Sequence, residues 1–292
     1  MQVMNFSTFK QLTRIEQSFF GLPFILAGAC LPFITHSLPL HFQIAWLWMI
    51  PAFFAARIAG MAFNQVIDSA LDAENPRTER RVVASGQLSH RVAYLIAWGA
   101  LLLFLLCCYQ INAPTLCFGL LAALVIGCYS YAKRVTYLCH LVLGLVHFLA
   151  PLMAWVAIVG KVTLLPLLLS LVSMTLIAGV DIIYALQDLA FDREHGVQSI
   201  PARFGVKGAQ AIAQLLHTLC LVALIFLGVF AHFSLLYYLC PILISFVFLI
   251  FHLKADEQLR RKRDYVGFAS LFFYCTVLSS SCTLFFLLLE YR

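Results

Sequence analysis

The sequence contains few charged residues. Of its 292 residues only 11% are Asp, Glu, Lys or Arg, whereas 63% are hydrophobic. A soluble globular domain carries about 25% charged and about 45–50% apolar residues, and a disordered chain is less hydrophobic still. The scarcity of charge therefore excludes an ordinary soluble enzyme and a disordered chain.

Two further kinds of signal are missing. The ten cysteines are scattered, mostly inside apolar runs, without a C-x-x-C pair. Cysteines in such runs are usually small hydrophobic side chains, so neither a disulfide framework nor a zinc site is indicated. No cleavable signal peptide is evident, because the first twenty residues are polar and amphipathic and lack an A-x-A-like cleavage site.

Long apolar runs are abundant. A helix that crosses a bilayer requires about 20 apolar residues. We predict an all-α polytopic membrane protein with nine transmembrane helices and one integral-membrane domain over residues 1–292, because the loops are too short for a soluble domain. The charge-free stretch 92–132 is divided at residues 110–114. The predicted spans are Ser18–Thr35, Ile44–Val66, Val92–Ile111, Thr115–Ala132, Tyr137–Val159, Leu164–Leu186, Ala209–Phe230, Leu235–Leu253 and Tyr265–Leu289.

The basic residues predict the orientation of the chain. With the N-terminus in the cytoplasm, sixteen of the nineteen Lys and Arg residues fall in cytoplasmic segments, whereas only Lys161 and Arg292 fall outside. Cytoplasmic loops of membrane proteins carry such an excess of Lys and Arg. The remaining basic residue, Arg57, lies within a span, and intramembrane arginines are functional by default.

Carboxylates gather at the ends of two spans that lie on the same predicted membrane face. In the first cluster, Asn64, Asp68 and Asp72 are four residues apart and therefore share one helical stripe. In the second, offsets of seven and four place Asp181, Asp188 and Asp192 on one stripe as well. Like charges at this spacing repel each other, so a cation is expected among them.

The ligand types favour magnesium. Oxygen ligands without nearby His or Cys suit Mg²⁺, which proteins commonly bind through a few carboxylates and substrate phosphates. We therefore predict two carboxylate stripes that hold Mg²⁺ ions around a diphosphate, with Lys and Arg from neighbouring loops neutralising the remaining charge. Solvated helix ends are the simplest alternative. A cation-coupled transporter is another, but transporter sites lie at broken helices near the midplane, and these acids lie at the cytoplasmic ends.

The two clusters and the segment between them resemble the UbiA superfamily of intramembrane prenyltransferases over essentially the whole chain. The matching stretches are FFAARIAGMAFNQVIDSALDAENPRTERRVVASGQLS, YSYAKRVTYLCHLVLG and GVDIIYALQDLAFDREHGVQSIPARFG. The family's first motif is often N-D-x-x-D-x-x-x-D, and Gln65 stands here at its second position. One carboxylate expected in the metal shell is therefore missing.

The resemblance implies nine transmembrane helices around a central cavity and Mg²⁺-assisted ionisation of a polyprenyl diphosphate. The allylic cation is then attacked by an electron-rich aromatic acid in quinone biosynthesis. Metal ligands are expected at Asn64, Asp68, Asp72, Asp188 and Asp192, and the four acids and Arg57 are expected to be catalytic. Substrate binding is expected of Arg14, Asn64, Lys133, Arg134, Asp181 and Tyr184.

The acceptor is left open. Two aromatic acids are the main candidates, and haem, a chlorophyllide, a glycerol-phosphate lipid or dihydroxynaphthoate are further alternatives that the superfamily allows. A 4-hydroxybenzoate-type acceptor is the first expectation, for ubiquinone. The N-terminal RIEQSFFGLPF is closer to a subgroup that resembles the naphthoate prenyltransferase of the futalosine route, which implies 1,4-dihydroxy-6-naphthoate and menaquinone. Arg57 would bind a phosphate or an acceptor carboxylate, or it would belong to a structural ion pair. His140 and His147 share a helix face at i, i+7, and we interpret them as core histidines in preference to bases.

The expected partners are the polyprenyl diphosphate, the aromatic acid and membrane lipid, without nucleic acid. The expected location is the bacterial inner membrane, with the active site facing the cytoplasm.

Overall fold

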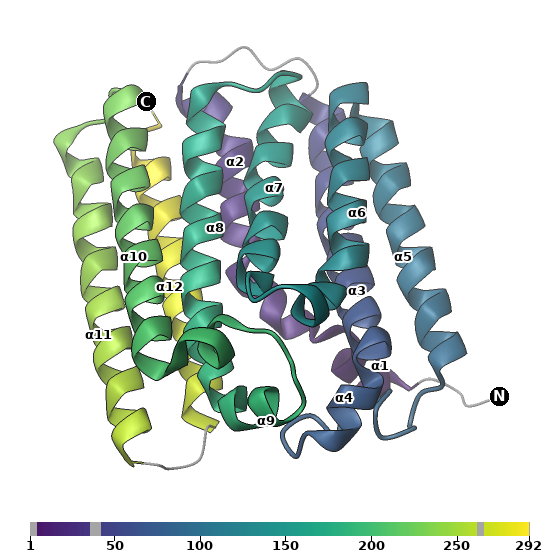
Figure 1. Ribbon diagram of the computed structural model, residues 1–292. Helices are drawn as coiled ribbons and strands as arrows, with labels where there is room; N and C mark the ends of the chain where they lie inside the picture. The colour runs from purple at the N-terminus through teal and green to yellow at the C-terminus, as the bar shows by residue number, and fades with distance from the viewer. Residues whose placement is uncertain (1–4, 36–41, 262–265, 292) are drawn as a thin grey trace. The chain divides into compact units, whose positions relative to one another are not determined.

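The computed structural model describes residues 5–35, 42–261 and 266–291. Among these residues the chain is all-helical, without a strand (Figure 1). It divides into two compact units, which are described separately: residues 1–18 with 41–131, and residues 19–40 with 132–292.

The first unit is built on the long helix α3 (Phe42–Ile67). Helix α5 (His90–Ile111) packs along α3. Helix α6 (Ala113–Val135) is joined to α3 by a hydrogen bond from Tyr129 Oη to the Gly60 carbonyl (3.2 Å), and its last residues belong to the second unit. The short helices α1 (Phe6–Thr13) and α4 (Ser69–Glu74) lie at the same end of α3 in Figure 1.

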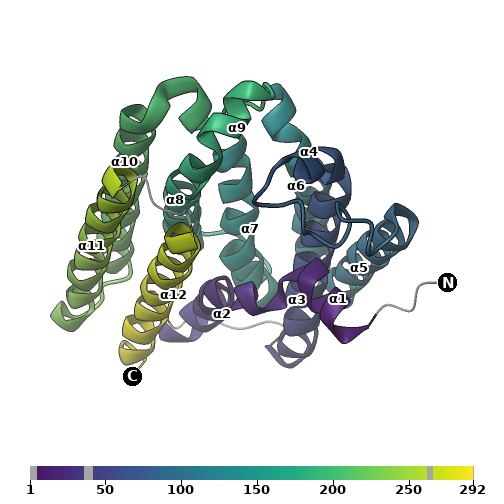
Figure 2. The same cartoon turned by 90° about the horizontal axis from the view of Figure 1, so that it is seen from below.

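The second unit surrounds α8 (Leu164–Tyr184), which contacts α2, α7, α10 and α12. A 3₁₀ turn, η2, and then α9 continue from the end of α8, and α9 lies beside the start of α10 (Figures 1 and 2). The other elements are η1 (Ile15–Phe20), whose first residues belong to the first unit, α2 (Leu22–Ile34), α7 (Cys139–Val159), η2 (Ala185–Asp188), α9 (Leu189–Glu194), α10 (Ile200–Phe230), η3 (Leu235–Tyr238), α11 (Leu239–Arg261) and α12 (Val266–Leu289).

Close helix packing in the second unit depends on glycines. A Cβ on Gly28 of α2 would clash with the Pro151 carbonyl oxygen of α7, and one on Gly179 of α8 would lie 2.6 Å from His217 Nε2 of α10. Small residues let helix backbones approach closely, which is how membrane helices gain packing contacts in lipid. These positions draw α2, α7, α8 and α10 together.

The predicted spans are confirmed in number. Nine helical segments of the described chain are long and apolar enough to cross a membrane, and the predicted break between Ile111 and Ala113 is present. Three bounds differ by more than five residues, because helical turns continue through polar residues: the sixth segment extends to Glu194, the seventh begins at Ile200 and the eighth extends to Leu259. The predicted start of the ninth span, Tyr265, lies outside the described residues, and the orientation of the N-terminus stays a prediction.

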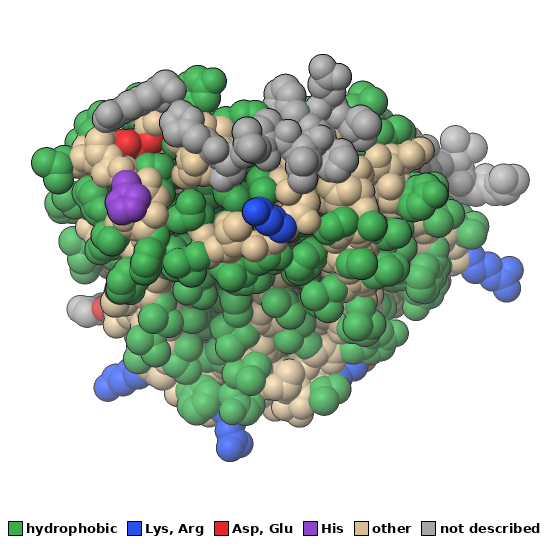
Figure 3. Space-filling model, turned by 90° about the horizontal axis from the view of Figure 1, so that it is seen from above, with side chains coloured by type: hydrophobic (Ala, Val, Ile, Leu, Met, Phe, Trp, Pro, Cys, Tyr) green, Lys and Arg blue, Asp and Glu red, His purple; other side chains and the backbone are tan. Residues whose placement is uncertain are grey.

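The outer surfaces of the helices are apolar. Leu95, Trp98, Leu102 and Leu106 of α5 are all more than half exposed. Exposed apolar side chains of this size are expected to face lipid in a transmembrane helix. Hydrophobic side chains are also widespread on the described part of the face seen in Figure 3, where charged side chains are few.

Candidate active site

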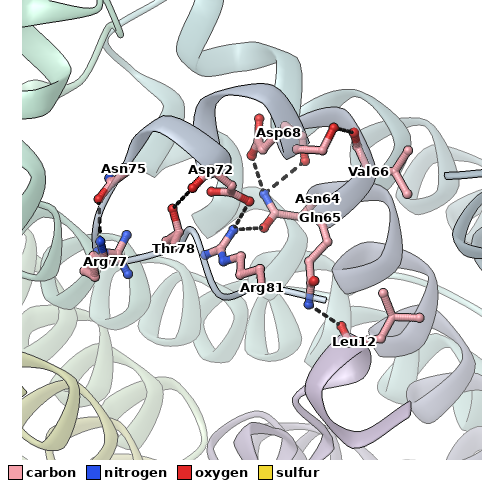
Figure 4. Close-up of polar contacts among 12 residues, drawn as sticks. Leu12, Asn64, Gln65, Val66, Asp68, Asp72, Asn75, Arg77, Thr78 and Arg81 are labelled. Carbon is pink, nitrogen blue, oxygen red and sulfur yellow. Dashed lines mark hydrogen bonds and ion pairs between the residues drawn. The ribbon is translucent and has the colours of Figure 1, made fainter. Parts of the chain in front are cut away.

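The first carboxylate cluster keeps its helical spacing although α3 ends within it. Helix α3 ends at Ile67, and Asp68 is the N-cap of α4, which carries Asp72. The Asp68 amide still donates to the Asn64 carbonyl (3.0 Å) and the Asp72 amide to the Asp68 carbonyl (2.8 Å). These i, i−4 bonds maintain the helical register. Asn64, Asp68 and Asp72 are therefore brought together as the sequence predicts (Figure 4).

The side chains of this cluster form one hydrogen-bonded network. Asn64 Nδ2 donates to Asp68 Oδ2 (2.7 Å) and, at 3.3 Å, to Ser130 Oγ of α6. Arg81 Nη1 donates to Asp72 Oδ2 at 2.8 Å and to Asn64 Oδ1 at 3.3 Å (Figure 4). Asp68 and Asp72 are both buried. A buried carboxylate requires a cation or hydrogen-bond donors, and the network supplies them.

Arg81 is a site residue that the sequence reasoning did not single out. Its side chain is only 16% exposed, and that of Asp72 only 7%. The loop that carries Arg81 is anchored by the buried side chains of Val82, Val83 and Leu88. The sequence predicts that a Lys or Arg from a neighbouring loop neutralises the acids. It does not indicate which one, because this loop contains three arginines. Arg80, by contrast, is 94% exposed.

Gln65 does not belong to the carboxylate cluster. Its Nε2 donates to the main-chain carbonyls of Gln11 (2.8 Å) and Leu12 (3.0 Å), at the end of α1. The last carbonyls of a helix lack intrahelical donors, and an amide satisfies two of them here. The Gln65 side chain thus points to α1 (Figure 4), and its effect on the metal shell stays a prediction.

Replacing this amide by a carboxylate tests the contact. In Gln65→Glu two carbonyl oxygens face an anion, and we expect a loss of about 1–3 kcal/mol, the cost of an unsatisfied buried polar group. Faster tryptic cleavage after Lys10 in detergent and a lowered melting temperature would report it. Gln11→Glu, on the exposed face of α1, is the matched control. Equal cleavage of both variants would contradict this role for Gln65.

Arg57 and Arg14 meet in the first unit. Arg57 Nη2 donates to Gln17 Oε1 (3.0 Å) and to the Arg14 carbonyl (3.4 Å). Arg14 itself caps α1 in a left-handed conformation, with φ 43°. Both acceptors are neutral oxygens, and these contacts orient the guanidinium of Arg57.

The second carboxylate cluster departs from a regular helix. The 3₁₀ turn η2 separates Asp181 in α8 from Asp192 in α9, so the single stripe assumed from 3.6-residue spacing is interrupted. Asp192 accepts a hydrogen bond from Ser199 Oγ (2.8 Å), the N-cap residue of α10. Ser199 was not predicted, although a Ser before a helical run is a recognisable N-cap signal.

Asp181 is held by a different partner. Its Oδ2 lies 2.7 Å from Nδ1 of His140, in the first turn of α7. The loop after α9 is tied to the same region, since the Gln198 amide donates to the Lys133 carbonyl (2.8 Å). Lys133 and Arg134 occupy the last turn of α6. The structure thus places the predicted basic pair beside the segment that follows the second cluster.

Tyr184 belongs to an aromatic group in the second unit. Its ring lies 5.4 Å from that of Phe272, which lies 5.6 Å from Phe20, and Phe20 lies 5.8 Å from His147. Tyr184 follows Asp181 by one helical turn. The acid cluster of this unit therefore adjoins an apolar, aromatic surface.

The donor set fits Mg²⁺. In the first unit, the oxygens of Asn64 and Asp72 already share one cationic group, the Arg81 guanidinium, and Asp68 is bonded to Asn64. No group of three or more His, Cys, Asp or Glu side chains suited to a metal occurs in the described part of the chain. Mg²⁺ commonly retains waters and takes substrate phosphates with one or two carboxylates.

The chain belongs to the UbiA prenyltransferase family, whose sequence profile matches residues 20–277. The resemblance inferred from the motifs is thereby confirmed. The chain is 30% identical over 192 residues to the 4-hydroxybenzoate octaprenyltransferase of Francisella tularensis subsp. novicida, covering 66% of this chain and 67% of that protein. It is 39% identical over 152 residues to the mitochondrial 4-hydroxybenzoate polyprenyltransferase of Drosophila melanogaster, a match that spans 51% of this chain but only 38% of that relative.

Solved structures agree with the fold. The apo structure of a UbiA homolog from Aeropyrum pernix K1 superposes with a TM-score of 0.81 at 26% identity, covering 96% of this chain and 99% of that one. A UbiA homolog from Archaeoglobus fulgidus, bound to GPP and Mg²⁺, gives a TM-score of 0.75 at 17% identity, covering 97% and 99%. The second likeness concerns the fold alone.

Proposed function

We propose that this protein transfers a polyprenyl group from a polyprenyl diphosphate to an aromatic acid in quinone biosynthesis. The observation that carries the proposal is the network of Asn64, Asp68, Asp72 and Arg81, which combines oxygen ligands with a cation at the end of a transmembrane helix. Membership of the UbiA family and relatives named for 4-hydroxybenzoate support it. The proposed location is a bacterial cytoplasmic membrane, with the acids on the cytoplasmic side.

The residues of the chain have separate roles in this proposal. Mg²⁺, when bound, stabilises the negative charge that develops on the departing diphosphate. Asp68, Asp72, Asp188 and Asp192, with Asn64, hold the metal–diphosphate group. Arg81, Lys133 and Arg134 offset charge as the allylic C–O bond breaks, since preorganised cations stabilise a transition state whose charge is developing. The aromatic group around Tyr184 shields the allylic cation from water and stabilises it by face-on contact.

Arg57 is assigned to the acceptor. It precedes Asn64 by seven residues of α3, about 10 Å at 1.5 Å per residue, and it is oriented by Gln17 and Arg14. With the diphosphate held at the carboxylates, Arg57 lies about 10 Å away along α3 and is left for the second substrate, the aromatic acid. A guanidinium binds a carboxylate in a bidentate manner, which suits an aromatic acid whose ring then reaches the allylic carbon.

The acceptor is identified by a product assay. Membranes that contain the protein are incubated with labelled polyprenyl diphosphate and either 4-hydroxybenzoate or 1,4-dihydroxy-6-naphthoate, and the lipids are analysed by mass spectrometry. Prenylated 4-hydroxybenzoate is expected. Product from the naphthoate alone would assign the chain to menaquinone synthesis, as its RIEQSFFGLPF segment suggests. Absence of product with either acid would contradict the proposal.

Arg57→Ala tests the assignment of the acceptor carboxylate. We expect the KM for the aromatic acid to rise about 10- to 100-fold, the cost of 1.5–3 kcal/mol for a hydrogen bond to a charged group, while the KM for the diphosphate changes little. Initial rates with each substrate varied in turn measure both constants. Arg91→Ala, an exposed arginine of α5, controls for charge. A rise confined to the diphosphate KM would place Arg57 on the donor.

A further inference from the structure

The hydrogen bond between His140 and Asp181 is not used by the scheme above. Nδ1 of His140 lies 2.7 Å from Asp181 Oδ2, and the two side chains are 5% and 21% exposed. A carboxylate accepts hydrogen bonds, so His140 donates its Nδ1–H. In the described part of the chain, His140 Nε2 is buried without a hydrogen-bond partner. The hydrogen bond from His140 across to α8 therefore holds the Asp181 carboxylate.

Exposure separates the roles of the two residues. A small molecule can reach Asp181, whereas His140 is enclosed between α7 and α8. Gly144, one turn further along α7, lets the two helices approach, because a Cβ there would lie 3.1 Å from Met174 of α8. The His140–Asp181 distance is thus set by helix packing. Such rigid placement is required of a group that must meet a reacting atom within hydrogen-bond distance.

We propose that Asp181 takes the proton that the aromatic acceptor loses and that His140 is the positioning residue that orients Asp181 for this transfer. The inference rests on the proposed function. The bond from the prenyl C1 to the diphosphate oxygen breaks first, and the diphosphate leaves with the electron pair. The allylic cation then forms a bond from C1 to a ring carbon, using an electron pair of the ring. The C–H bond at that ring carbon then gives its proton to a carboxylate oxygen of Asp181 and its electron pair to the ring, which regains aromaticity. No oxidant or reductant is required.

Asp181 is better suited to this role than the other acids of its unit. Asp188 and Asp192 are assigned to the metal–diphosphate group, which makes their oxygens unavailable as bases. Asp181 lies two helical turns before Asp188 and one turn before Tyr184, beside the aromatic group. An acceptor ring held against these aromatic side chains is adjacent to its carboxylate.

The test is a kinetic isotope effect with an acceptor deuterated at the carbon that receives the prenyl group. In the wild-type protein with Mg²⁺ we expect no primary effect, since ionisation of the donor is slow and proton loss is fast. His140→Ala is expected to lower kcat about 10- to 100-fold, part of the roughly 10²–10⁴-fold supplied by a positioned base, and to reveal a primary isotope effect. The KM for the diphosphate should stay unchanged.

Three further variants make the test decisive. His140→Gln can donate an amide N–H to Asp181 and is expected to restore most of the rate and suppress the isotope effect. Asp181→Asn retains the shape without the base and should show the effect. His217→Gln is the matched control, because His217 is equally buried but pairs with His252 (2.9 Å). It is expected to lose thermal stability without an isotope effect.

The outcomes separate this inference from the proposed function. Wild-type protein that prenylates neither aromatic acid would overturn the proposed function itself. Active wild-type protein together with His140→Ala and Asp181→Asn proteins that lack an isotope effect would overturn only the role of the His140–Asp181 pair. A lowered rate of these variants with an unchanged isotope effect would also overturn the role of the pair, because it indicates that the two residues have only a structural role.

Discussion

Prenyl transfer by this protein is expected to stop when divalent cations are removed with EDTA. The acids of the two clusters, at least three of which (Asp68, Asp72 and Asp192) are buried, are proposed to hold the diphosphate through Mg²⁺. A metal contributes several kcal/mol of charge stabilisation, so the rate should fall at least about 1,000-fold, at 1.36 kcal/mol per decade. Formation of prenylated product, followed with labelled diphosphate, measures the loss.

The metal effect has two controls. Restoring Mg²⁺ or Mn²⁺ is expected to restore the rate, which shows that EDTA did not denature the protein. The melting temperature in detergent should not change with EDTA, because the fold is built from helix packing and Asp72 is already paired with Arg81 at 2.8 Å. Full activity in metal-free buffer would remove the central claim of the proposed function.

The second large effect is expected from substitution of single acids. Asp68→Ala, Asp72→Ala, Asp188→Ala and Asp192→Ala are each expected to lower turnover at least about 100-fold, the scale of losing one electrostatic stabiliser of a transition state. Steady-state rates of the purified variants, each at saturating Mg²⁺ and both substrates, measure this. Wild-type rates in Asp68→Ala and Asp188→Ala would show that the clusters are solvated helix ends.

Stability must be measured beside activity in these variants. Removal of Asp72 leaves Arg81 buried without its ion-pair partner, which is strongly destabilising. Asp72→Asn retains the volume and one hydrogen-bond acceptor for Arg81, and is the better variant there. Glu79→Ala and Glu194→Ala provide matched controls, because both acids are exposed and adjoin the first and second clusters. Their rates should match those of the wild type.

The sequence by itself predicts the nine helices, because about 20 consecutive apolar residues have few other stable states than a membrane span. It also predicts the first cluster: spacing of four residues survives the end of α3, since the main-chain hydrogen bonds continue from Asn64 to Asp72. Both properties are local, determined by composition and by the geometry of one helix. The family resemblance follows from the same local motifs.

Only the tertiary structure decides which partner each polar side chain meets. Gln65 looks like a defective motif position in the sequence, but it binds the end of α1, 53 residues away along the chain. The local sequence does not distinguish Arg81 from Arg80. The fold of the loop places the Arg81 side chain against Asp72 and leaves that of Arg80 exposed. His140 reads as a core histidine until the packing of α7 on α8 brings it to Asp181. A side chain's partner depends on contacts between distant segments, and helix periodicity carries no information about those.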